Sequence, residues 1–166
     1  MRNIRIMYQY DGSKYYGFQR QKNKDTVQGD IEKIVFSKFN EKINMTSSGR
    51  TDRGVHALGQ VSNFSISKRI PLDAIKQQIN KTLRDRVKIL SIEEIRENFN
   101  ARFDAKRRTY LYVLKNESKI TPFEAPYVTS IKEEIDIDKL QLIFQPLIGV
   151  HDFSSFAKKD EAMRNP

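Results

Sequence analysis

The chain has 166 residues and a formal net charge of +9, enough for one domain, or for one domain and part of another. Its content of large apolar residues exceeds that of disordered chains, and it has no cysteine for disulfides, thiolate chemistry or zinc–sulfur sites and only two histidines. The apolar stretches are too short to span a bilayer, and the N-terminus lacks a signal-peptide core. We therefore expect a soluble, cytoplasmic protein without a metal, whose positive charge favours a polyanionic partner such as nucleic acid.

The first two thirds of the chain alternate strand and helix patterns. Thr26 is placed to cap a helix in which apolar residues recur at helical spacing as far as Phe39, and Pro71 opens a second amphipathic helix. Alternating apolar residues and turn signals predict strands at residues 3–10, 43–48, 58–66 and 87–95. The resulting β-α-β-β-α-β order predicts an α+β fold, with a ferredoxin-like antiparallel sheet and both helices on one face.

The rest of the chain is expected to begin a second, similar unit. A fifth strand over residues 107–114 would extend the first sheet, and a helix over 140–148 would end or kink where Pro146 removes a backbone donor. We divide the chain into an N-terminal ferredoxin-like subdomain, residues 1–115, and a connector with the beginning of an incomplete C-terminal subdomain, residues 116–166.

One expected loop carries residues suited to chemistry. Residues 48–56 read SGRTDRGVH and place a single carboxylate, Asp52, between two arginines. A carboxylate kept ionised by guanidinium groups suits nucleophilic attack or proton transfer on an anionic polymer. The alternative is a turn aspartate whose side chain accepts hydrogen bonds from loop amides, since glycines flank the loop. His56 is a general base by type, and a structural hydrogen-bonding role suits it equally.

Basic residues also gather before two tyrosines. Cations within residues 102–108 lead directly into Tyr110 and Tyr112, a combination in which basic groups clamp phosphates while a ring stacks on a base. The alternative for Tyr110 is packing in the core or on the sheet surface. The aromatic residues at 15, 16 and 18 are interpreted as part of a structured, partly buried loop.

The residues GRTDRGVHA, 49–57, closely resemble the signature of the tRNA pseudouridine synthase A family. Four further blocks match that family in the expected order: YDG at 10–12 with YGFQ at 16–19, TVQ at 26–28, ARFDA at 101–105 through YLY at 110–112, and HDFSSF at 151–156. The resemblance covers nearly all of the chain.

This resemblance implies that uridine is isomerised to pseudouridine at several neighbouring positions of the tRNA anticodon stem-loop, without cofactor or metal. It matches Asp52 to the catalytic aspartate, Tyr110 to a tyrosine that stacks on the target base, and Arg50 to an arginine that helps hold the base out of the helix. Arg53 stands where a small residue is usual. The arginines that remain as candidates for RNA contact are Arg53, Arg102, Arg107 and Arg108.

Members of this family also carry a second ferredoxin-like unit that completes the pocket, and they form homodimers. We therefore expect an N-terminal fragment, and a catalytically silent RNA-binding fragment is the alternative to an active enzyme. An RNA recognition motif shares the element order, but its glycine–aromatic strand signature is missing, because Leu111 stands between the tyrosines. A structural basic protein, such as a ribosomal component, is a third interpretation, and it predicts that Asp52 is replaceable.

Overall fold

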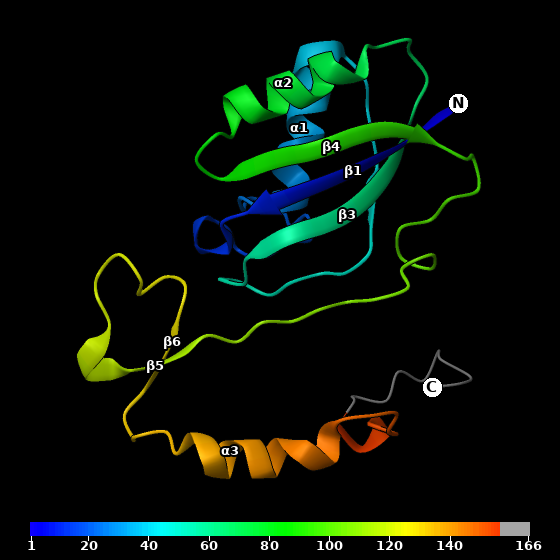
Figure 1. Ribbon diagram of the computed structural model, residues 1–166. Coiled ribbons are helices and arrows are strands. Elements are labelled where there is room, and N and C mark those ends of the chain that lie inside the picture. The colour runs from blue at the N-terminus through cyan, green and yellow to red at the C-terminus, as the bar shows by residue number, and fades with distance from the viewer. Residues whose placement is uncertain (157–166) are drawn as a thin grey trace. The chain divides into compact units, whose positions relative to one another are not determined.

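The computed structural model describes residues 1–156, and the chain divides into two compact units, Met1–Tyr112 and Val113–Pro166 (Figure 1). The regular elements of the first unit are β1 (Arg2–Tyr10), α1 (Val27–Phe39), β2 (Thr46–Ser47), β3 (Ala57–Ile66), α2 (Leu72–Thr82) and β4 (Val87–Ile95), with a short 3₁₀ turn at Gly12–Lys14. Their order confirms the predicted β-α-β-β-α-β arrangement.

The four strands of the first unit form one antiparallel sheet in the order β2-β3-β1-β4. The central strand β1 pairs with β3 through Ile6↔Ser62 and with β4 through Ile6↔Ile92. Each helix connects strands that are not neighbours in the sheet. This topology confirms the α+β, ferredoxin-like prediction.

Both helices cover the same face of this sheet, as Figure 1 shows. Ile4 and Ile6 on β1 are fully buried in a core that also contains Ile31 of α1 and Ile75 of α2. On the opposite face, Met7 of β1 is 40% exposed. The helix-free face and the loops at the strand ends are therefore the surfaces that remain for function.

Local signals explain where the first helix begins and how it holds the next strand. The Thr26 hydroxyl accepts a hydrogen bond from the Gly29 amide, 3.2 Å away, and so caps α1. Within α1, the buried Glu32 accepts from the Met45 amide at 3.0 Å. Since Met45 directly precedes β2, this contact fixes the strand from which the Asp52 loop departs.

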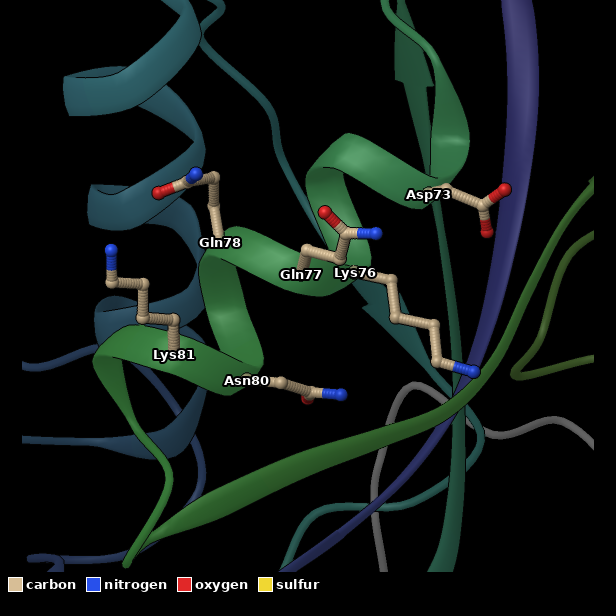
Figure 2. Close-up of a pocket in the computed structure, with 6 residues that line it drawn as sticks. All are labelled: Asp73, Lys76, Gln77, Gln78, Asn80 and Lys81. Carbon is tan, nitrogen blue, oxygen red and sulfur yellow. The ribbon is translucent and has the colours of Figure 1, made fainter.

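Side chains of α2 cover the outer edge of β4. Figure 2 shows Lys76 and Asn80 extending from α2 toward that strand, where Lys76 Nζ donates to the Leu90 carbonyl at 2.7 Å. Asn80 donates to the Ile89 carbonyl at 3.1 Å and accepts from the Ile89 amide at 2.6 Å. The edge groups of Ile89 are thus satisfied within the chain rather than left open for strand addition.

As far as residue 156, the second unit contains a pair of short parallel strands, β5 (Leu114–Asn116) and β6 (Thr129–Ile131), and one α-helix, α3 (Ile137–Phe144). Asp136 caps α3 by accepting from the Lys139 amide at 3.0 Å. A 3₁₀ turn over Gln145–Leu147 follows, which confirms that Pro146 ends the helix. Further 3₁₀ turns lie at Glu117–Lys119 and Ser154–Phe156. The proposed division into subdomains after residue 115 stays a prediction.

The predicted fifth strand over residues 107–114 is wrong. Residues 105–113 have no regular structure, and the strand that begins at Leu114 pairs with β6 in a separate sheet. The neighbouring sheet edge, β2, has only two residues. Just beyond it, the Ser48 carbonyl already accepts a hydrogen bond from the Arg108 side chain. An alternating pattern makes a strand only where a partner edge accepts it, and this edge is too short.

Candidate functional site

The loop between β2 and β3 presents Asp52 at the surface. The side chains of Arg50, Asp52 and Arg53 are exposed, and Gly54 takes a positive φ of 84° that turns the chain back toward β3. In the described part of the chain, the Asp52 carboxylate accepts no hydrogen bond from loop amides. The geometry therefore differs from that of a turn aspartate that caps its own loop.

Two hydrogen bonds hold Thr51, the residue directly before Asp52. The Tyr10 and Thr51 hydroxyls share a hydrogen bond of 2.8 Å, and the Phe18 amide donates to the Thr51 carbonyl at 3.0 Å. Burial raises the pKa of Tyr10, so its phenol stays protonated. Thr51 is thus fixed through both its side chain and its carbonyl, and the exposed Asp52 follows directly after this fixed residue.

His56 has a structural contact at the other end of this loop. Its Nδ1 accepts from the Gly12 amide at 3.1 Å and lies 3.2 Å from Asp11 Oδ1. Burial of Asp11 works to raise its pKa, but hydrogen bonds from Ser13, together with the nearby Lys14, outweigh it and lower the pKa. The ring thus joins the loop after β1 to the Asp52 loop.

The predicted basic segment is tied to the same region of the first unit. The Ala101 amide donates to Asn63 Oδ1 at 2.8 Å, and the Arg108 guanidinium donates to the carbonyls of Ser48, at 2.7 Å, and Arg102, at 3.0 Å. Arg108 therefore anchors its segment to the start of the Asp52 loop. This contact brings Arg108 next to Ser48, sixty positions earlier in the chain.

Tyr110 follows two residues after that anchor and is 71% exposed. Its ring is therefore outside the core, contrary to the core-packing alternative. Arg102 lies with its guanidinium carbon 5.6 Å from the centre of the Phe103 ring, and the Arg107 side chain is exposed.

The arginines beside Asp52 do not form the expected ionic clamp. Among the described residues, no ion pair joins Asp52 to Arg50 or Arg53. The guanidinium carbon of Arg53 instead lies 4.7 Å from the centre of the Tyr16 ring. The sequence pattern placed Tyr16 in a structured, partly buried loop, and no local spacing links it to Arg53.

Neither hollow described on the surface includes the Asp52 loop. The one over α2 is lined by Asp73, Lys76, Gln77, Gln78, Asn80 and Lys81 (Figure 2), and the apolar one lies along α3 in the second unit. Within residues 1–156, no cluster of three histidine or carboxylate side chains suits a metal. None of the described helices is both long and apolar enough to cross a bilayer.

Residues 6–104, well over half of the chain, match the family described as tRNA pseudouridine synthase. The chain belongs to this family. Synthases of this kind are isomerases. The match contains the whole Asp52 loop and ends before Arg107, Arg108 and Tyr110.

Individual synthases support the assignment. A tRNA pseudouridine synthase A of Borrelia turicatae is 41% identical over 157 residues, which are 95% of this chain and 64% of that protein. A tRNA pseudouridine synthase A of Caldicellulosiruptor saccharolyticus is 40% identical over 156 residues, or 94% of this chain and 64% of that protein. The chain thus spans about 64% of the length of these synthases.

Proposed function

We propose that this chain is the N-terminal part of a cytoplasmic tRNA pseudouridine synthase that acts on uridines of the anticodon stem-loop, with Asp52 as its catalytic carboxylate. The observation that carries the proposal is the exposure of Asp52 on a loop that is held at Thr51 by Tyr10, the last residue of β1, and at His56 by the Gly12 amide just after that strand. Family membership supports the reaction class.

The reaction is an isomerisation in which no group is lost. The N1–C1′ bond of uridine breaks, the uracil turns, and C5 bonds to C1′, while the proton on C5 leaves and N1 gains one. Attack on C1′ and abstraction of a sugar proton both require an ionised oxygen facing the ribose, which an exposed aspartate supplies. The target base lies in a stem, so binding must supply the few kcal/mol that unstacking costs.

The other site residues take roles around the extruded nucleotide. In this proposal Tyr110 stacks on the target base, Arg50 helps hold it out of the helix, and Arg102 and Arg107 contact the RNA backbone. The exposure of Tyr110 and the net charge of +9 support these roles. Arg108 is also proposed near RNA, although two backbone carbonyls already accept from its guanidinium.

Two further parts of the proposal follow from the family resemblance. Residues 116–166 begin a second ferredoxin-like subdomain that completes the pocket, and the whole protein acts as a homodimer on tRNA. The competing function is RNA binding without turnover. It is favoured by the fact that the chain spans only about 64% of its relatives' length.

Release of tritium from RNA labelled at uridine C5 tests the proposal, since the C5 proton leaves in the reaction. The assay uses the chain alone and the chain fused to the region of the Borrelia turicatae relative that it does not cover. Asp52→Asn should abolish release in the active form, whereas the exposed Asp85→Asn should not. Undiminished release by Asp52→Asn would overturn the catalytic role. RNA binding without release by either form would favour the silent alternative.

A further inference from the structure

Two cations flank one exposed ring beside Asp52. The Arg53 guanidinium carbon lies 4.7 Å, and Lys24 Nζ 5.4 Å, from the centre of the Tyr16 ring, which belongs to a residue 48% exposed. We propose that these three residues, called here the Tyr16 platform, form a binding site for a phosphate of the RNA backbone. The inference rests on the proposed function, because it takes RNA as the ligand.

Hydrogen bonds to its own main chain hold Tyr16 within its loop, and the next residue packs against the Asp52 loop. The Tyr16 amide donates to the Asp25 carbonyl at 3.0 Å, and Gln21 Nε2 donates to the Tyr16 carbonyl at 2.9 Å. Gly17 follows with a φ of +102°, and a Cβ placed there would lie 3.4 Å from the Thr51 carbonyl oxygen and 3.6 Å from the Arg53 nitrogen. The two loops therefore touch along their main chains.

The cations of the platform are available to a ligand. Neither Arg53 nor Lys24 has a carboxylate partner among residues 1–156. By contrast, the nearby Arg20 is paired with Glu32 at 2.7 Å. An unpaired cation at the surface has its donors satisfied only by water, which a phosphate oxygen can replace.

Contact with the Tyr16 ring limits the motion of Arg53 without occupying its hydrogen-bond donors. The guanidinium carbon lies 4.7 Å from the ring centre, and among residues 1–156 no acceptor takes a hydrogen bond from this guanidinium, so its N–H groups are available to a phosphate. Because the ring already restricts the side chain, less conformational entropy is lost when a phosphate binds. Tyr16 thus acts as a positioning residue for Arg53.

The site's location links it to the reaction. Arg53 follows Asp52 directly in the chain, and a phosphate lies on either side of every ribose in RNA. A phosphate held by Arg53 would belong to the nucleotide whose ribose faces Asp52, or to its neighbour. The platform would therefore help to bring the sugar to the carboxylate.

The test measures how salt affects binding of the 166-residue chain to a fluorescent RNA hairpin with stem uridines. Loss of one phosphate contact reduces the slope of log affinity against log salt by about 0.7–0.9 and weakens binding on the order of fivefold at 0.15 M salt. We expect this change for Arg53→Ala. The matched control, Arg69→Ala, also removes an exposed charge and should leave the slope unchanged. Equal slopes for the two variants would overturn the proposal.

Two further variants test the role of the ring. Arg53→Lys keeps the charge but not the planar group, so the slope should stay and the affinity should fall. Tyr16→Leu should weaken binding, and Arg53→Ala should then cost less in the Tyr16→Leu background than in the parent. Additive costs would mean that Tyr16 contacts a base independently and would refute the paired site.

The outcome is separable from that of the proposed function. If neither the chain nor its fusion to the uncovered region of the relative releases tritium, but the slope difference is present, the synthase proposal fails and the phosphate site stands. Tritium release that depends on Asp52, together with equal slopes for Arg53→Ala and Arg69→Ala, would support the synthase proposal and refute the phosphate site.

Discussion

Gly12 has no room for a side chain, which makes it a sensitive test of how the Asp52 loop is held. A Cβ at this position would lie 2.0 Å from the carbonyl oxygen and 2.4 Å from the carbonyl carbon of Val55. To reach an ordinary contact of 3.4 Å, the oxygen must move by about 1.4 Å, the difference between 3.4 and 2.0 Å. The same movement strains the 3.1 Å hydrogen bond from the Gly12 amide to His56.

Gly12→Ala should therefore lower the free energy of unfolding by about 2–4 kcal/mol, about 1–3 from overpacking and about 1 from the hydrogen bond. Gly59→Ala is the matched control, because a Cβ there meets nothing within 4 Å and the two changes have the same effect on the unfolded chain. Urea denaturation followed by circular dichroism measures both. If the two variants differ by less than about 0.5 kcal/mol, the contact does not constrain the loop.

In an active form of the protein, a shift of this size should also reduce turnover. A displacement of about 1 Å at a reacting group costs on the order of 100-fold in rate. Tritium release by Gly12→Ala at the rate of Gly59→Ala would show that the reaction tolerates movement of the loop.

The remaining predictions concern single contacts. Tyr10→Phe removes the 2.8 Å hydrogen bond to Thr51 and should cost about 1 kcal/mol in urea denaturation; no change would mean that this contact does not hold the loop. In the second unit, hydrogen bonds from a lysine and a threonine lower the pKa of Glu124 to about 2, so its stabilising contribution is full above pH 4.5 and is lost as pH falls toward 2. Because the Thr121 amide donates to this carboxylate at 3.1 Å, its NMR shift should titrate with a midpoint near 2, a transition that Glu124→Gln should remove; a midpoint near 4.5 would contradict the contact.

The local pattern of the chain predicted both helices and the three long strands of the first unit, whereas the strand expected over residues 43–48 is reduced to Thr46–Ser47. The Thr26 cap, the start at Pro71 and the strand over residues 87–95 depend on neighbours within a few residues, and the structure confirms each. The GRTDRGVHA loop was also visible as the candidate site, because its residues are contiguous. Its catalytic role stays a proposal.

Only the tertiary structure decided which distant groups meet. The pattern over residues 107–114 predicted a strand, but no sufficient sheet edge is there to receive it. Tyr15 and Tyr16 are adjacent residues of the same type, yet Tyr15 is 2% exposed and Tyr16 is 48% exposed. The two arginines beside Asp52 were expected to keep it ionised, yet Arg53 lies against Tyr16 instead. Such contacts depend on how strands and loops pack in space, so the spacing of residues along the chain does not predict them.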